Sequence, residues 1–241
     1  MKAKALLLAG SLLLAPLSAH ALVELGAKAV FWFPEISGDF EVGTGLTRQI
    51  GDVKDLTSDE SALVGEVFLR GSNHLLSVSG ARFDLSGPRG SLEYTMLDFA
   101  WEWDFINLEN VFAGFSLGPV LQVKLLDGTL DVLPTVAAAR FTEDFTAPVP
   151  LLGLGVHVGL LKDILEARAR ATAIGYAGNS LVDASAEVSY NPLPFIEVVG
   201  GYRHISIDLD TDNVAAAEGN NVILDFRQSG PYLGVAVKVG M

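Results

Sequence analysis

Hydrophobic and polar residues alternate at every second position along most of the chain. In the segment after Tyr94, one set of alternate positions is mainly apolar, with Thr95, Leu97, Phe99, Trp101, Trp103 and Phe105, and the other is mixed and acidic, with Met96, Asp98, Ala100, Glu102 and Asp104. A period of two is the side-chain repeat of a β-strand, not of a helix. The pattern predicts an all-β chain whose strands have one apolar and one polar face.

Alternating segments recur ten times, at roughly 22–33, 62–70, 74–84, 93–105, 109–126, 149–161, 164–175, 181–190, 195–208 and 222–241. The connections are in turn short (71–73, 106–108, 161–163 and 191–194) and mostly longer (34–61, 85–92, 127–148, 176–180 and 209–221). Short turns at one rim and long loops at the other are typical of outer-membrane barrels. We predict a transmembrane antiparallel up-and-down β-barrel of about ten strands, with eight as the alternative.

Two details follow from this division of the chain. The connections 34–61 and 127–148 are expected over the external mouth, and 135–141 is compatible with one or two turns of helix. The Gly178-Asn179 pair suggests a hairpin turn that sets Arg170 about opposite Glu187.

The first 21 residues have the pattern of a secretory signal peptide. Lys2 and Lys4 precede ten apolar residues, 5–14, and the small-x-small pattern of a cleavage site ends at Ala21. Ten apolar residues are too few to span a bilayer. The expected organisation is a signal peptide over 1–21 and one barrel domain over 22–241, exported to the outer membrane.

The aromatic residues indicate which face meets lipid. Trp101, Trp103 and Phe105 cluster at one end of their strand and Phe31, Trp32 and Phe33 at the other end of the first, as the interfacial girdles of a membrane barrel require. The polar face then lines the lumen. It carries nine acidic and six basic residues: Glu24, Lys28, Glu66, Arg70, Asp98, Glu102, Asp104, Glu166, Arg168, Arg170, Asp183, Glu187, Glu197, Arg203 and Lys238.

Composition and net charge exclude several classes of function. The net charge is −13, so a nucleic-acid partner is not expected. The chain has no cysteine, which excludes thiol catalysis and a lipid anchor on cysteine, and no motif for a cofactor is present. The first and third long connections are acidic, and carboxylates there are candidate contacts for divalent cations shared with lipopolysaccharide: Glu35, Asp39, Glu41, Asp52, Asp55, Asp59, Glu60, Asp127, Asp131, Glu143 and Asp144.

The C-terminal quarter resembles a known class. The stretch 200–208 (GGYRHISID) and the later 230–234 (GPYLG) are similar to the closing motif of a family of small bacterial outer-membrane barrels of largely uncharacterised function. The last strand, apolar at every second position up to Met241, resembles the signal read by the barrel-assembly machinery, although the usual terminal residue is Phe. The resemblance implies an outer-membrane place among lipid and lipopolysaccharide, and no reaction.

Three functions fit this chain. The first is a non-enzymatic structural or surface-contact barrel whose lumen is narrow or plugged by ion pairs. The second is a narrow channel for small solutes or ions, with charged rings that set selectivity. The third is a lipid-modifying enzyme that uses His204 and Ser206, because their spacing resembles that of lipid A deacylases of the outer membrane; no carboxylate is fixed beside them. We expect the first, with no catalytic, cofactor or metal residue.

Overall fold

The computed structural model describes residues 23–42, 49–52, 61–87, 90–109, 113–132, 141–160, 164–176, 179–210 and 222–240. Its strands are β1 (Val23–Trp32), β2 (Glu35–Val42), β3 (Gln49–Asp52), β4 (Ala62–Gly71), β5 (His74–Gly87), β6 (Gly90–Trp103), β7 (Ile106–Glu109), β8 (Ala113–Val132), β9 (Phe141–Leu160), β10 (Leu165–Tyr176), β11 (Asn179–Leu193), β12 (Ile196–Asp210) and β13 (Val222–Gly240). Within the described residues no helix is long and apolar enough to cross a membrane.

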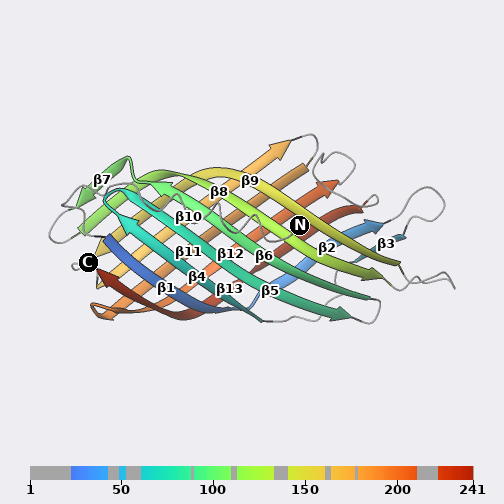
Figure 1. Ribbon diagram of the computed structural model, residues 1–241, viewed down its shortest axis with the longest axis horizontal. Helices are drawn as coiled ribbons and strands as arrows, with labels where there is room; N and C mark the ends of the chain where they lie inside the picture. The colour runs from blue at the N-terminus through green and yellow to red at the C-terminus, as the bar shows by residue number, and fades with distance from the viewer. Residues whose placement is uncertain are drawn as a thin grey trace, which may run out of the picture.

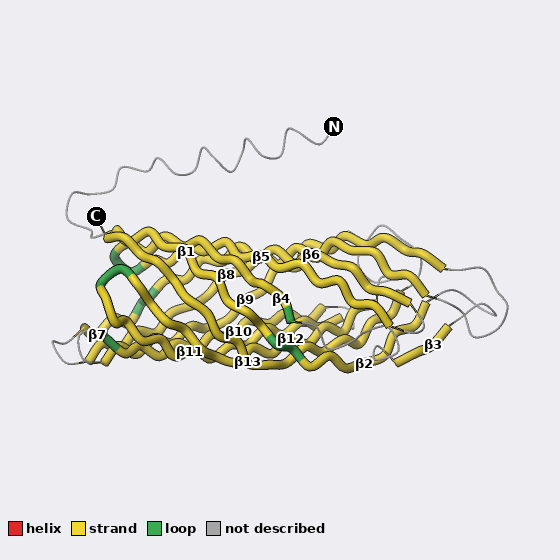
Figure 2. The backbone as a smooth tube through the Cα atoms, turned by 90° about the horizontal axis from the view of Figure 1, so that it is seen from below, coloured by secondary structure: helices red, strands yellow, loops and turns green. Residues whose placement is uncertain are grey.

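Ten of these strands form a closed antiparallel barrel (Figure 1). The order is β1-β4-β5-β6-β8-β9-β10-β11-β12-β13, and β1 pairs with β13 to close the ring. The ten-strand prediction is confirmed, and the eight-strand alternative is wrong. The start of β1 and the end of β13 lie at the same end of the barrel (Figure 2), together with the short turns, so we assign this end to the periplasm.

Three short strands extend the wall beyond the ring. After β1 the chain breaks at Phe33 and Pro34, because proline has no N–H to donate to the ladder, and β2 then takes over the pairing with β13. The short β3 pairs with β2, and β7 pairs with the first residues of β8 at the periplasmic end.

The outer half of the barrel was expected to be loop and is instead strand. Strands β8 and β9 pair in unbroken register from Ala113 and Leu160 to Val132 and Phe141, so most of 127–148 belongs to the wall. Two threonine hydroxyls on the outer face donate to aspartates across this ladder: Thr129 to Asp144 and Thr146 to Asp127, both at 2.6 Å. Strands β2 and β3 likewise occupy part of 34–61.

Other parts of these predictions are not tested. The segments 43–48, 53–60 and 133–140 lie outside the described residues, and so do all but the last residue of the candidate helix 135–141 and residues 1–21, which were expected to form the signal peptide.

The polarity of the wall inverts part of the way along each long strand. In β8 the periplasmic part has Leu121 and Val123 outside and Gln122 and Lys124 inside, whereas the outer part has Asp127 outside and buried apolar residues inside. The same change occurs in the other long strands. The section with an apolar exterior is the one that suits a bilayer, and the section with a polar exterior suits water.

The interior of the outer section is a packed apolar core. An aromatic series crosses it: Trp32 meets the ring of Phe83 edge-on at 5.8 Å, Phe83 stacks on Tyr94 at 4.6 Å, and Tyr94 meets Phe226 edge-on at 6.0 Å. These residues come from β1, β5, β6 and β13, so the core joins well-separated parts of the wall. Around them the core contains Ile36, Leu85, Leu92, Met96, Leu126, Leu130, Leu151, Leu181, Ile205 and Ile207.

Candidate functional site

The structure places all the charged residues expected in the lumen at inward-facing positions. Most of them alternate along their strands with outward residues that are more exposed. They occupy the periplasmic section of the barrel, below the apolar core. The inner wall there includes glycines that make room for them: a Cβ at Gly155 would lie 2.3 Å from a Glu102 carboxylate oxygen.

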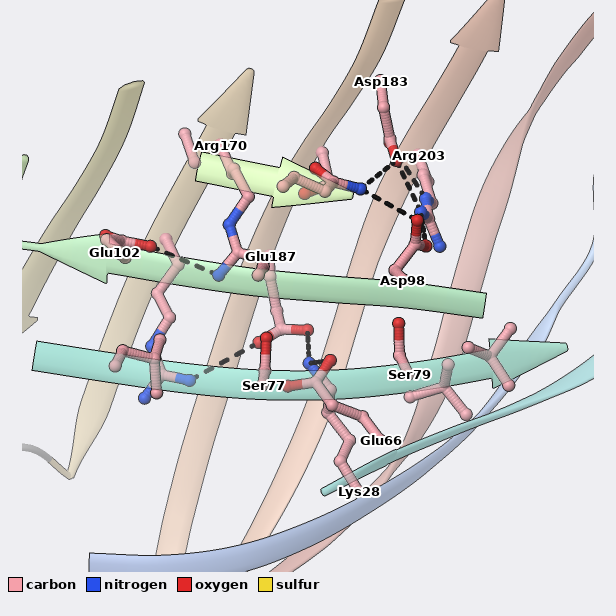
Figure 3. A pocket seen from close by; sticks show the side chains of 18 of the residues that line it. Lys28, Glu66, Ser77, Ser79, Asp98, Glu102, Arg170, Asp183, Glu187 and Arg203 are labelled. Atoms are coloured by element: carbon pink, nitrogen blue, oxygen red, sulfur yellow. Dashed lines mark hydrogen bonds and ion pairs between the residues drawn. The ribbon is translucent and has the colours of Figure 1, made fainter. Parts of the chain in front are cut away.

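Directly below the apolar core lies a cluster of four charged side chains, of which Figure 3 labels Asp98, Asp183 and Arg203. Lys124 is fully buried, and its Nζ lies 2.5 Å from Asp98 Oδ1 and 2.9 Å from Asp183 Oδ2. Arg203 reaches the same two carboxylates, with Nη2 at 2.9 Å from Asp98 and 2.6 Å from Asp183. Two cations therefore face two anions, so the cluster is locally neutral, as buried ions require.

Polar and aromatic neighbours complete this four-charge cluster. The Gln122 amide donates to Asp98 Oδ1 at 2.9 Å, and the Thr172 hydroxyl donates to the Gln122 carbonyl oxygen at 2.9 Å. The Arg203 guanidinium also lies over the Trp32 ring, 5.6 Å from its centroid. The cluster is thus tied to the base of the apolar core.

The ion pairs of the four-charge cluster cross the lumen. Asp98 is on β6 and Arg203 is on β12, and these strands are five places apart in a ring of ten, on opposite walls. Lys124 on β8 and Asp183 on β11 are three places apart. At that level side chains from opposite walls contact one another across the lumen.

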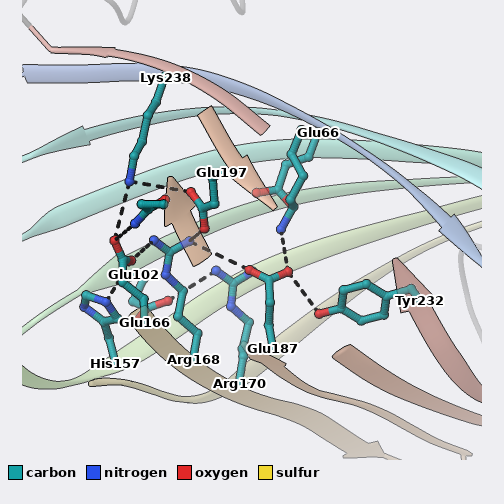
Figure 4. A network of polar contacts seen from close by, with 12 residues as sticks. Glu66, Glu102, His157, Glu166, Arg168, Arg170, Glu187, Glu197, Tyr232 and Lys238 are labelled. Carbon is teal, nitrogen blue, oxygen red and sulfur yellow. Dashed lines mark hydrogen bonds and ion pairs between the residues drawn. The ribbon is translucent and has the colours of Figure 1, made fainter. Parts of the chain in front are cut away.

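A second network lies nearer the periplasm (Figure 4). Its centre is Glu166, which is nearly fully buried; one oxygen accepts from Arg168 at 2.5 Å and lies 3.1 Å from His157 Nε2. Its other oxygen lies 3.4 Å from Lys238 Nζ. Glu197 lies within 4.0 Å of Arg168 and 3.6 Å of Lys238, so these acids and bases share partners.

A third group joins the first and last strands to β11. Lys28 Nζ lies 3.3 Å from Glu66 and 3.1 Å from Glu187, and the Tyr232 hydroxyl donates to the same oxygen of Glu187 at 3.0 Å. Because β1 and β11 are three places apart through the closing seam, this group also crosses the lumen.

The predicted pairing of Arg170 with Glu187 is wrong. In the β10–β11 ladder Arg168 is opposite Glu187 and Arg170 is opposite Ser185, because the strands continue to Tyr176 and Asn179 and the turn between them is tighter than expected. Arg170 instead reaches Glu102 on β6, at 3.2 Å.

Several residues of the site were missed in the sequence. Lys124 follows the alternation of Leu121, Val123 and Leu125 and so could have been assigned to the lumen. Tyr232 was noted only as part of a motif. Trp32 was assigned to the lipid-facing girdle, which is wrong: its side chain is 1% exposed and its indole N–H donates to the Gly230 carbonyl oxygen at 3.1 Å.

On the outer wall, the structure places the aromatic candidates at the surface. Trp101, Trp103 and Phe105 are 38%, 45% and 52% exposed near the periplasmic rim. The Trp101 indole lies 3.3 Å from His74 Nδ1, on the neighbouring strand.

The candidate pair His204 and Ser206 also faces outward, at the outer border of the apolar exterior. His204 does not contact Ser206; its Nδ1 lies 2.5 Å from the hydroxyl of Ser229 on β13. In the described part of the chain no three His, Cys, Asp or Glu side chains form a group that could hold a metal ion. Binding of divalent cations by the acidic segments stays a prediction, and Asp55, Asp59 and Glu60 lie outside the described residues.

Comparison with known proteins concerns the fold. No family model and no curated sequence matches the chain. The outer membrane protease OmpT of Escherichia coli has a similar structure, with a TM-score of 0.55 and 8% identity over 90% of this chain and 97% of that one. Neisserial surface protein A also matches, with a TM-score of 0.41 and 15% identity over 91% and 99%. The chain has the fold of an outer-membrane β-barrel.

Proposed function

We propose that this chain is a closed, non-enzymatic barrel of the outer membrane with a structural and surface-contact role. The observation that carries the proposal is the contact between Arg203 and Asp98 from opposite walls of the lumen. A conducting ring of charges holds its side chains apart around water. In this barrel the charges of Arg203 and Asp98 neutralise one another across the centre of the lumen.

The apolar core supports the same function. It fills the outer section of the barrel above the four-charge cluster, with Leu85 and Ile205 completely buried. An ion that passed the cluster would then have to enter an apolar medium, where an unpaired charge is very costly. Two different barriers therefore lie in series between the periplasm and the outside.

Planar-bilayer recordings of the refolded protein test this proposal against the channel alternative. We expect no discrete conductance steps from protein that is shown to be folded by its heat-dependent gel migration. A channel would give steps whose ion selectivity shifts in Arg170→Ala, since Arg170 is among the more exposed lumen cations. Such steps in the native protein would overturn the proposal.

The exterior supports insertion among outer-membrane lipid. Leu233, Val235, Val237 and Val239 of β13 all face outward and are more than half exposed, which is the surface that lipid and the barrel-assembly machinery would contact. Lipopolysaccharide would meet the polar outer section. Substituting Val235 and Val237 with Asp should lower the amount of assembled barrel in cells, whereas unchanged assembly would count against this role of the strand.

Lipid hydrolysis by His204 is disfavoured by the geometry. His204, Ser206 and Ser229 lie in ladders paired on both sides, so the nearby backbone N–H groups are directed at neighbouring strands and form no oxyanion hole. We expect the folded native protein to release no fatty acid from lipopolysaccharide or phospholipid vesicles. Release that disappears in His204→Ala would establish the enzyme instead.

A further inference from the structure

The periplasmic section of the lumen is not completely filled. A cavity of about 130 Å³ lies between the ion-pair networks, where Figure 3 shows side chains from several strands converging. One buried water needs about 10–15 Å³ by this measure, so the cavity could hold roughly ten waters or one small solute. Lining residues such as Arg170 and Glu66 keep side-chain exposures of 30% and 22%, so solvent reaches the cavity.

The cavity opens toward the periplasm. Two of its lining residues mark the periplasmic side: Arg70 lies near the end of β4, and Asp104 directly follows β6. The four-charge cluster and the apolar core lie on the opposite side. A solute would therefore enter from the periplasm and leave the same way.

Two charges at the mouth of the cavity have no ion pair. Among the described residues, the guanidinium of Arg70 and the carboxylate of Asp104 make no hydrogen bond and have no opposite charge within 4.0 Å. One Asp104 oxygen, Oδ1, is buried without a partner. Deeper in the lumen Glu102, Glu166 and Glu187 all have cationic partners. Among the described residues Glu24, which is opposite Arg70 in the β1–β4 ladder, also has no cation within 4.0 Å.

The two unpaired charges are set apart by the sheet. Arg70 is on β4 and Asp104 follows β6, with β5 between them, so their backbones are about two strand spacings, or roughly 10 Å, apart. Asp104 is held in place by its main chain: its N–H donates to the Asn73 carbonyl oxygen at 2.8 Å, and its carbonyl oxygen accepts from the Asn73 amide at 3.1 Å. The backbone that carries the carboxylate is therefore held by the neighbouring turn.

We infer that the cavity binds a small zwitterion of the amino-acid class, with its carboxylate on Arg70 and its ammonium on Asp104. A molecule with both charges satisfies both groups and leaves the neutral networks intact. An anion alone would leave Asp104 without a partner, including its buried oxygen Oδ1, and a cation alone would leave Arg70 without a partner. The hydroxyls of Ser77 and Ser79 also line the cavity and can accept or donate further bonds.

Ligand-observed NMR with glycine as the probe tests this inference on the refolded full-length barrel in detergent. We expect saturation transfer to glycine, and much weaker transfer to acetate and to methylammonium, which each carry one of the two charges. In Arg70→Met and in Asp104→Asn the Kd for glycine should rise at least tenfold, because each change removes one partner of a charge-assisted hydrogen bond.

Matched controls separate this site from general charge effects. Arg82→Met and Asp84→Asn change an arginine and an aspartate on the exposed outer face of β5 and should leave the Kd unchanged. The inference is overturned if glycine gives no saturation transfer to the native barrel, if acetate binds as well as glycine, or if neither cavity variant weakens binding while remaining folded by gel migration. None of these results depends on whether the barrel conducts.

Discussion

The two sections of this barrel share one wall but have opposite interiors. In the periplasmic section the exterior is apolar and the interior contains interlocking ion pairs, whereas in the outer section the exterior carries Asp127 and Thr129 and the interior is a core of apolar side chains. The medium outside the wall accounts for the exterior of each section. Paired charges with a solvent-reached cavity occupy the interior of one section, and packed apolar side chains occupy the interior of the other.

This difference shows how the side chains of a ten-strand wall can themselves occupy the inside of the barrel. The ion pairs leave a cavity of about 130 Å³ beside Arg170, whereas apolar side chains pack the section beyond it. Trp32 joins the two, since its ring contacts both Phe83 of the core and Arg203 of the four-charge cluster. Each section should therefore respond to a different kind of substitution.

The largest expected effect comes from the four-charge cluster. Asp183→Ala leaves Lys124 and Arg203 facing only one carboxylate, and breaking a buried ion network by removing one partner costs about 3–5 kcal/mol. Urea unfolding of the barrel in lipid vesicles measures the loss. The control Asp225→Ala, which breaks an exposed pair with Arg227, should cost at most about 1 kcal/mol. Equal losses in the two variants would contradict the buried cluster.

The apolar section should respond to loss of volume. Leu85 is completely buried on β5, and Leu85→Ala should lower the free energy of unfolding by about 2–5 kcal/mol, since it removes buried methyl groups and leaves a cavity. The same urea titration applies, with Leu85→Met as the control that keeps the volume. A loss below about 1 kcal/mol for Leu85→Ala would mean that the outer section is not packed.

The border between the sections can be located with an inserted charge. Leu154 faces outward within the apolar exterior, and Leu154→Arg should destabilise the barrel by about 2–4 kcal/mol because the charge meets hydrocarbon. Thr129→Arg, on the outer face of the polar section, should change stability little. Reversed effects would mean that the membrane surrounds the outer section and not the section with the apolar exterior.

The smallest effect is expected for an exposed ion pair on the outer section. Arg82 and Glu93 lie 3.4 Å apart with side chains 72% and 51% exposed, so Arg82→Ala should cost at most about 1 kcal/mol and less in high salt. A larger loss of unfolding free energy in the urea titration would show that the exposed pair stabilises the barrel as strongly as a buried ion pair does.

The fold was predictable because alternation is a local signal. Every barrel strand falls on a segment found by its period of two, and the outer parts of β8 and β9 were missed only because their exposed Asp127 and Asp144 read as loop residues. The alternation continues there with its sign reversed, since Leu126 and Leu130 are buried. A search for period two without a fixed apolar face would have found it.

The contacts of the site were less predictable. Which residues face the lumen follows from alternation, but which of them meet does not. Arg170 pairs with Glu102, 68 positions away, because the closure and stagger of the barrel bring β10 near β6. A register error at one hairpin was enough to assign Arg170 to Glu187. Which residues pair across a lumen can be told only from the three-dimensional arrangement of the strands.

Thiol labelling from each side of the membrane tests the two-section lumen most directly, because the native chain has no cysteine. Single substitutions Ser79→Cys in the cavity, Leu130→Cys in the apolar core and Thr129→Cys on the outer face would be exposed to a membrane-impermeant reagent. We predict that Ser79→Cys reacts only from the periplasmic side, Thr129→Cys only from the external side, and Leu130→Cys from neither. Reaction of Leu130→Cys from outside, or of Ser79→Cys from both sides, would show an open lumen and contradict the account.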